Sequence, residues 1–279
     1  MHISVKQVPF FILTALALAS SVAAQSTAAS VPSPAHLVVV IEENHGYSQI
    51  IGSSQAPYIN TLALEGALFT NSSAIAHPSQ PNYLDLFSGS NQGVTDDSCP
   101  HTFSVSSLES ELNGAGQTFT GYSEGLPAVG STVCTSGLYA RKHVPWTDFS
   151  KDLTADNEPF TSFPTDYSKL PTVAWVIPNL DDDMHNGTIQ EGDSWLQTHL
   201  LAYVNWAMTN NSLLIVTFDE DQGTTANHIA TIFVGSMVKP GKYGEKINHY
   251  NVLRTIEDMY GLGHLGSSAN ATAITDVWQ

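Results

Sequence analysis

The stretch HLVVVIEENHG, residues 36–46, decides how this chain folds. His36–Glu42 is an almost unbroken run of Val, Leu and Ile, which is typical of a strand covered on both faces. Similar runs occur at Thr172–Ile177, Ser212–Phe218 and Ile229–Val234. Helical patterns lie between these runs, and buried strands that alternate with helices form mainly parallel sheets covered on both sides. We therefore expect an α/β protein with a three-layer α/β/α sandwich.

Further elements are expected around these strands. The spacing of apolar residues predicts an amphipathic helix over Ser194–Met208, with Asp193 as its N-cap. The remaining patterns predict strands at Ala67–Asn71 and Thr118–Tyr122, and helices at Tyr58–Gly66, Ser79–Phe87, Ser104–Leu112 and Tyr250–Tyr260. Residues 124–170 are rich in Gly, Pro, Ser and Thr, so we interpret them as long loops.

Composition excludes two classes of partner. The 279 residues carry 9 Lys+Arg against 26 Asp+Glu, for a formal charge of −17, and 42% of them are hydrophobic. The chain is long and apolar enough to bury a substantial core. Nucleic acids and anionic membranes bind proteins mainly through Lys and Arg, so neither nucleic-acid binding nor stable membrane association is expected. The sequence does not predict an oligomeric state.

The N-terminus predicts export. Residues 1–24 resemble a signal peptide: Lys6 precedes the apolar run Val8–Leu18, and the small residues 22–24 form a cleavage site. An uncleaved anchor is the alternative. Residues 25–34 then form a linker, and residues 35–279 a single, secreted domain. The other signs of export are Cys99 and Cys134, which can form one disulfide or remain free, and glycosylation sequons at Asn71, Asn186, Asn210 and Asn270.

Polar residues follow three of the predicted buried strands. Glu42-Glu43-Asn44-His45 follows the first, residues 181–185 (DDDMH) follow the second, and Asp219-Glu220-Asp221 follows the third, with His228 just before the fourth. Ligands bind beyond the carboxyl ends of such strands. Because crowded carboxylates repel, we expect a divalent metal ion there: Mg, Ca or Mn for oxygen ligands, or Zn or Fe if imidazoles take part. Acidic loops without a ligand are the alternative.

Ser79 is the candidate nucleophile. It lies in AHPSQPNY, residues 76–83, where a helix is expected to begin. The positive end of a helix favours an alkoxide and a phosphoryl group, and a bound metal would activate the hydroxyl further. The alternative is an ordinary helix N-cap.

Taken together, these stretches resemble the phosphoesterase family, which groups secreted acid phosphatases with bacterial phospholipases C within the alkaline-phosphatase superfamily. The matching stretches are VVVIEENHGYSQIIG (38–52), SAIAHPSQPNYLDLFSG (73–89), YARKHVPWTDF (139–149), VIPNLDDDMHNGTIQEGDSWL (176–196), LIVTFDEDQGTTANHIATIFVG (214–235) and NHYNVLRTIEDMYGL (248–262). They follow the family's order and cover most of the chain beyond the predicted signal peptide. The resemblance implies an alkaline-phosphatase-like fold.

The resemblance also implies roles for individual residues. Ser79 would be the phosphorylated nucleophile. The metal ligands would be Glu43, Asn44, Asp219 and Glu220, together with Ser79. His185 and His228 would contact the phosphoryl group or protonate the leaving alcohol, and Asn82 would reach a phosphoryl oxygen. Asp193 would support the ligands, or would form a second metal site with Asp181 and His185.

Two departures from related enzymes bear on the metal. Asn44 stands where two-zinc members of the superfamily have Asp, and its neutral amide favours one metal ion over two. Glu220 is one methylene longer than the Asp of some relatives, which affects ligand distance and metal choice.

The resulting hypothesis is a secreted, metal-dependent acid phosphatase that acts on small phosphomonoesters through a phosphoserine. A phospholipase C or phosphodiesterase using the same site is the nearest alternative. A non-catalytic binding protein is less consistent with the full set of candidate residues. An α/β-hydrolase esterase is disfavoured because the chain has no G-x-S-x-G motif.

Overall fold

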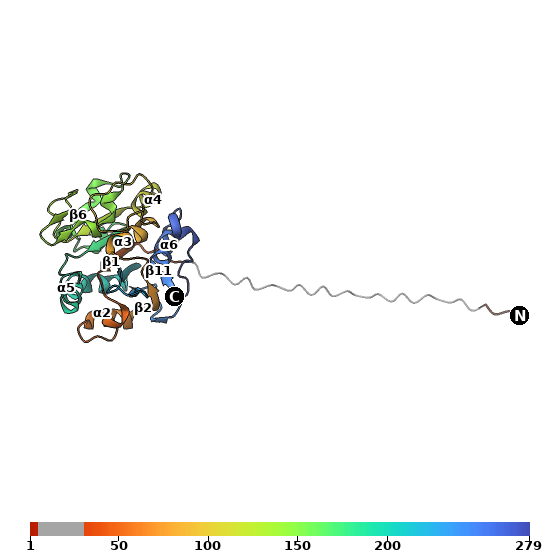
Figure 1. Ribbon diagram of the computed structural model, residues 1–279. Helices are drawn as coiled ribbons and strands as arrows, with labels where there is room; N and C mark the ends of the chain where they lie inside the picture. The colour runs from red at the N-terminus through yellow and green to blue at the C-terminus, as the bar shows by residue number, and fades with distance from the viewer. Residues whose placement is uncertain (5–30) are drawn as a thin grey trace.

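The computed structural model describes residues 1–4 and 31–279. Most of the predicted signal peptide and linker lies outside these residues. At the centre is a nine-stranded sheet of order β10-β2-β9-β8-β1-β7-β3-β6, with β11 paired to β2 (Figure 1). The strands are β1 (His36–Glu42), β2 (Ala67–Ser73), β3 (Phe119–Ser123), β6 (Asn157–Pro159), β7 (Val173–Ile177), β8 (Ser212–Phe218), β9 (His228–Gly235), β10 (Gly241–Tyr243) and β11 (Ile247–Asn248).

The sheet is mainly parallel, with one strand reversed. β1 pairs in parallel with β7 on one side and β8 on the other. β9 runs antiparallel to both of its neighbours, β8 and β2. The start of β9 therefore lies at the same edge of the sheet as the ends of β1, β2 and β8. This edge carries the predicted polar residues.

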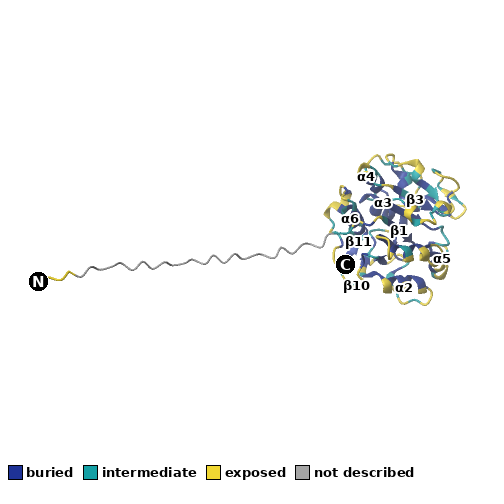
Figure 2. Ribbon diagram, turned by 180° about the vertical axis from the view of Figure 1, so that it is seen from behind, coloured by how far each residue is buried: buried dark blue, intermediate teal, exposed yellow. Residues whose placement is uncertain are grey.

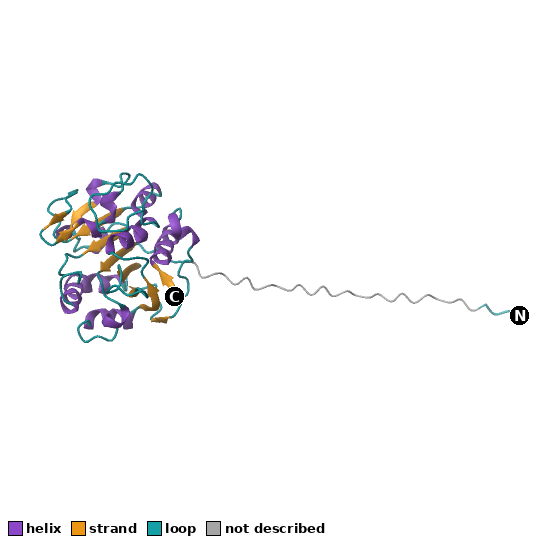
Figure 3. Cartoon of the chain, viewed as in Figure 1, coloured by secondary structure: helices purple, strands orange, loops and turns teal. Residues whose placement is uncertain are grey.

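Helices cover both faces of the sheet (Figure 3). Leu37, Val39 and Ile41 of β1 pack into the core cluster that includes α3, α4 and α6, whereas Val38 and Val40 pack into the cluster that includes α1, α2 and α5. Removing one such side chain from water contributes about 2 kcal/mol. The helices are α1 (Tyr47–Ile50), α2 (Pro57–Glu65), α3 (Ser79–Ser88), α4 (Leu108–Gly114), α5 (Ile189–Ala207) and α6 (His249–Tyr260).

The predicted three-layer α/β/α sandwich is confirmed. Figure 2 shows the buried strands between helices with exposed residues on their outer faces, except that all of α3 is buried. Residues that alternate along β1 enter opposite cores, which is why the strand reads as a continuous apolar run. Within the described residues, no helix is long and apolar enough to cross a membrane.

The predicted start of α5 is wrong. The helix begins at Ile189, five residues before the predicted start, because Thr188 and Glu191 form a capping box. Asp193 is therefore inside α5 and is not its N-cap. Its carboxylate instead accepts hydrogen bonds from the backbone N–H groups of Tyr58 and Ile59, at 3.1 and 2.8 Å, and so caps α2.

Residues 124–170 contain more local structure than the predicted loops. Besides β6 they form the short antiparallel pair β4 (Thr135–Ser136) and β5 (Tyr139–Ala140), and several 3₁₀ turns, of which one is Arg141–His143. Cys99 and Cys134 form a disulfide, as expected, which ties this region to the loop after α3.

Candidate active site

The carboxyl edge of the sheet brings the predicted metal ligands and Ser79 together. Glu43 and Asn44 follow β1, and Asp219 and Glu220 follow β8, the strand next to β1. Ser79 is the first residue of α3, which is reached from the end of β2. All of these side chains are buried except Asn44, which is partly buried.

The Ser79 hydroxyl lies between two carboxylates. Its Oγ donates to Glu43 Oε2 at 2.9 Å and lies 3.3 Å from Glu220 Oε1. One turn further along α3, the Tyr83 hydroxyl donates to the other oxygen of Glu43, at 2.6 Å. Residues four apart share one face of a helix, so α3 holds Glu43 with two hydroxyls.

Asn44 connects the two strand ends. Its backbone N–H donates to Asp219 Oδ1 at 3.0 Å, and its side-chain amide donates to Glu43 Oε2 at 3.0 Å. The residue has a φ of 56°, in the left-handed region that Asn tolerates better than most residues. This backbone conformation lets one residue contact both carboxylates.

The carboxylates are in an unfavourable electrostatic environment. Burial and the neighbouring Asp219 and Asp183 raise the pKa of Glu43 well above its ordinary value. Burial and the adjacent Glu220 raise the pKa of Asp219 to about 8. Asp219 Oδ2 is buried without a hydrogen-bond partner. A buried, unpartnered carboxylate oxygen is costly, and a bound cation would satisfy it.

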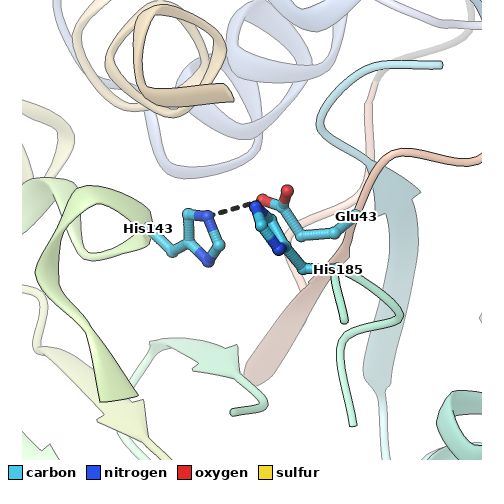
Figure 4. A group of neighbouring side chains, drawn as sticks. All are labelled: Glu43, His143 and His185. Carbon is cyan, nitrogen blue, oxygen red and sulfur yellow. Dashed lines mark ion pairs between the residues drawn. The ribbon is translucent and has the colours of Figure 1, made fainter. Parts of the chain in front are cut away.

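A second group of side chains lies beside Glu43 (Figure 4). One donor atom each from Glu43, His143 and His185 lies within 4.8 Å of the others. His143 Nε2 is 3.1 Å from Glu43 Oε1, and its Nδ1 is 3.2 Å from Asp183 Oδ2. The ring of His143 also stacks on that of Tyr83, with centroids 5.0 Å apart. Two imidazoles therefore lie next to Glu43, the carboxylate that accepts the hydrogen bond from the Ser79 hydroxyl.

The ammonium group of Lys142 lies beside His185. Lys142 Nζ is 3.2 Å from His185 Nε2 and pairs with Asp97 Oδ2 at 2.7 Å. The other oxygen of Asp97 accepts the backbone N–H of Gln80, the residue after Ser79, at 3.0 Å. The Asp97 carboxylate therefore stands at the start of α3, and the Lys142 ammonium lies between that carboxylate and His185.

Four other candidates are engaged elsewhere. Asn82 Oδ1 accepts the backbone N–H groups of residues 75 and 76, and its amide donates to the carbonyls of residues 76 and 78, so it shapes the turn before Ser79. Both oxygens of Asp193 cap α2. The described contacts of Asp181 are made by its backbone. Asp183, in the same loop, is the residue whose carboxylate lies beside His143. His228 stacks on Tyr47 and bonds the carbonyl of Thr70.

Sequence reasoning missed Tyr83, Lys142, His143 and Asp183 as site residues. A signal existed for each of them. Tyr83 is four residues from Ser79 on a predicted helix, Asp183 is in the quoted DDDMH stretch, and Lys142 and His143 are in the quoted stretch YARKHVPWTDF. The loops carry no periodicity, so their position over the sheet edge could not be inferred.

The residues present fit a divalent metal ion. Carboxylate and amide oxygens are offered by Glu43, Asn44, Asp219 and Glu220. Of these, Asp219 Oδ2 has no hydrogen-bond partner and is free to act as a metal ligand. His143 and His185 offer nitrogen next to Glu43. Oxygen ligands suit Mg, Ca and Mn, whereas mixed oxygen and imidazole ligands also suit Zn and Fe.

The carboxyl edge of this sheet carries a hydroxyl, carboxylates and imidazoles. Hydrolytic enzymes use these groups. The chain belongs to the phosphoesterase family, whose model matches residues 53–263. It is therefore a phosphoric ester hydrolase, as predicted.

Named relatives support the assignment as a phosphoric ester hydrolase. The chain is 54% identical over 254 residues to the phosphatidylinositol-3-phosphatase of Mycobacterium tuberculosis, covering 90% of this chain and 85% of that one. It is 30% identical over 227 residues to an acid phosphatase of Aspergillus fumigatus and 29% identical over 272 residues to a probable acid phosphatase of Kluyveromyces lactis. It spans 51% and 63% of the length of those two fungal proteins.

Solved structures share the fold. A protein of the alkaline phosphatase superfamily from Vibrio parahaemolyticus superimposes with a TM-score of 0.59 at 13% identity, covering 88% of this chain and 72% of that one. The lipoteichoic acid synthase of Listeria monocytogenes gives a TM-score of 0.60 at 9% identity, covering 85% and 73%. The predicted alkaline-phosphatase-like fold is thus confirmed.

Proposed function

We propose that this protein is a secreted, metal-dependent acid phosphatase that hydrolyses phosphomonoesters through a phosphoserine at Ser79. The observation that carries the proposal is the position of the Ser79 hydroxyl. It is buried at the start of α3, hydrogen-bonded to Glu43 and close to Glu220. An ordinary capping serine would bond to backbone N–H groups of its own helix, whereas this hydroxyl faces the ends of β1 and β8.

A divalent ion would be held by Glu43, Asn44, Asp219 and Glu220. When bound, it would supply Lewis-acid polarisation and offset the negative charge of these residues. The neutral side chain of Asn44 favours one ion. His185 lies beside Glu43 and is partly exposed, so it could reach the substrate, whereas His143 is buried with its ring nitrogens facing Glu43 and Asp183.

The first step would form the bond between Ser79 Oγ and phosphorus as the bond to the leaving oxygen breaks. The hydroxyl proton passes to a carboxylate that it contacts, Glu43 or Glu220. The N-terminus of α3 and the Lys142 ammonium stabilise the phosphoryl oxygens. This local positive charge is needed because the whole chain is strongly acidic and repels phosphate esters.

The leaving alcohol needs a proton, and His185 is the candidate supported best. It lies beside Glu43, His143 and Lys142, whereas the His228 ring is engaged with Tyr47 and Thr70. In the second step, water attacks the phosphoserine, Ser79 leaves with a proton, and inorganic phosphate is released. A protonated imidazole suits an acidic working range.

The substrate class is supported by the relatives. Several related proteins are named acid phosphatases, and the mycobacterial one is named for the 3-phosphate of phosphatidylinositol, which is a monoester group. Hydrolysis of p-nitrophenyl phosphate should therefore exceed that of bis-p-nitrophenyl phosphate. Phosphatidylinositol 3-phosphate is the second substrate to test, and phosphatidylcholine tests the phospholipase C alternative. Preference for either diester would overturn the monoester proposal.

Secretion is proposed from the predicted signal peptide and is consistent with the disulfide between Cys99 and Cys134. The four sequon residues, Asn71, Asn186, Asn210 and Asn270, are exposed and so accessible to a glycosylation enzyme. Sequencing the N-terminus of the exported protein would test the cleavage near Gln25. A retained N-terminus would favour the anchor.

A further inference from the structure

Asp97 makes two contacts beside the active site that the mechanism above leaves unexplained. Its Oδ1 accepts the backbone N–H of Gln80 at 3.0 Å, and its Oδ2 pairs with Lys142 Nζ at 2.7 Å. One carboxylate thus joins the residue after Ser79 to the only cation that contacts His185 within the described residues.

The contact with Gln80 fixes the start of α3. The N-cap position of that helix is Pro78, which has no side-chain acceptor to offer. The free N–H groups of the first turn need a partner, and Asp97 supplies one from outside the helix. The carboxylate is favoured there by the helix dipole.

The contact with Lys142 fixes the ammonium group. A lysine side chain has four carbons and many rotamers, so an unrestrained ammonium spends little time in any one place. Lys142 is 19% exposed and reaches both Asp97 and His185, which restrains it between two groups. An ion pair that solvent still reaches adds little stability, about 0–1 kcal/mol, so the value of this pair is positional.

The disulfide secures this arrangement. Cys99 is two residues from Asp97, and Cys134 lies in the segment that leads to Lys142. The carbonyl of Cys134 accepts the backbone N–H of Arg141 at 2.9 Å. The covalent bond therefore joins the Asp97 loop to the turn that carries Lys142.

We propose that Asp97 is a positioning residue, which holds Lys142 in place for the phosphoryl group, and that the Cys99–Cys134 disulfide keeps Asp97 and Lys142 together. This inference rests on the proposed phosphatase function. It assigns a role in turnover to a carboxylate that carries no proton in the reaction and to a disulfide outside the site.

The test is a double-mutant cycle with Asp97→Asn and Lys142→Met. Asparagine keeps an oxygen for Gln80 N–H and removes the charge that holds Lys142. With p-nitrophenyl phosphate, Asp97→Asn should lower kcat about tenfold in the wild-type background and less than about twofold in the Lys142→Met background. Asp96→Asn is the matched control: Asp96 is exposed, its carboxylate bonds only within its own loop, to Ser98, and the variant should keep wild-type kcat.

A purely electrostatic role predicts a different result. Removing a negative charge near the anion site would then lower KM, and the inhibition constant of inorganic phosphate, with kcat unchanged. That outcome, or equal effects of Asp97→Asn in both backgrounds, would overturn the inference. Thermal unfolding of each variant checks that the fold is intact.

The disulfide is tested by replacing Cys99 and Cys134 with serine together. This variant should lower kcat as Asp97→Asn does, and the two changes combined should lower it little further. Full activity without the disulfide would overturn its part in the inference. A wild type that hydrolyses no phosphate ester would overturn the proposed function itself, whereas an active wild type with an unaffected Asp97→Asn variant would overturn only the role of Asp97.

Discussion

Ser79 Oγ donates to Glu43 Oε2 at 2.9 Å, although the two residues are 36 positions apart in the chain. The contact joins the first residue of α3 to the end of β1. It is the point where a hydroxyl at the positive end of a helix meets the carboxylates of the sheet.

Replacing Ser79 with alanine should lower kcat/KM for phosphomonoesters by about 10³-fold or more, because the attacking hydroxyl is then lost. The unfolding temperature should change little. Ser88→Ala is the matched control: Ser88 ends the same helix and bonds the carbonyl of Leu84, so its loss should leave turnover within about twofold. Substantial activity in the Ser79 variant would remove Ser79 from its role.

Removing the metal should greatly reduce turnover and lower stability. Without a cation, Glu43, Asp219 and Glu220 are crowded carboxylates, and Asp219 Oδ2 has no partner. Dialysis against a chelator should reduce activity about 100-fold, and one divalent ion should restore it. Elemental analysis should find about one ion per chain, because the neutral side chain of Asn44 favours one metal ion over two. Full activity in protein shown to be metal-free would contradict the site.

His185→Ala should affect substrates according to their leaving groups. An alkyl phosphate needs a proton on its leaving oxygen, whereas p-nitrophenol leaves readily without one. The variant should lose about 10²-fold or more with glycerol phosphate and much less with p-nitrophenyl phosphate. If His228→Ala shows this pattern and His185→Ala does not, the acid is His228, and the site rearranges when substrate binds.

Stability should fall as the pH rises from 5 to 8. Burial raises the pKa of Glu109 to about 9 from its ordinary 4.5, and that of Asp152 to about 7. Between pH 4.5 and 9 the folded state holds a proton at Glu109 that the unfolded chain releases, so folding becomes less favourable as the pH rises. The unfolding temperature should drop by roughly 5 °C over this range.

Glu109→Gln provides the control for this pH effect. Glutamine is neutral at every pH and keeps an oxygen to accept the backbone N–H of Leu153, which Glu109 holds at 2.5 Å. The variant should lose much of the dependence of unfolding temperature on pH. Parallel profiles for wild type and variant would show that Glu109 does not titrate in this way.

The long strands of the central sheet could be predicted to within two residues, most closely where both faces are buried, whereas the short strands β6, β10 and β11 were not predicted. His36–Glu42 and Ser212–Phe218 match β1 and β8, since each apolar run ends where the polar edge begins. The start of α5 was missed because its first turn, Ile189–Asp193, is mostly polar and adds little to the apolar stripe.

Within the site, the residues directly after β1 and β8 and at the start of α3 were predicted, as was His185 on the loop after β7. The residues missed were Tyr83, Lys142, His143 and Asp183. Glu43, Asp219 and Ser79 are positioned by β1, β8 and α3. Lys142 and His143 reach the site from a 3₁₀ turn that tertiary contacts hold over the sheet edge. The family resemblance gave Asp193 a supporting role in the site, but the backbone N–H groups at the start of α2 take up its carboxylate.

The most direct test of the account is the stereochemical course at phosphorus, measured with a phosphomonoester made chiral by oxygen isotopes. A phosphoserine at Ser79 requires two in-line displacements, each of which inverts the phosphorus. The account therefore predicts overall retention of configuration. Inversion would mean that water attacks the ester directly, and it would contradict the role of Ser79 as nucleophile.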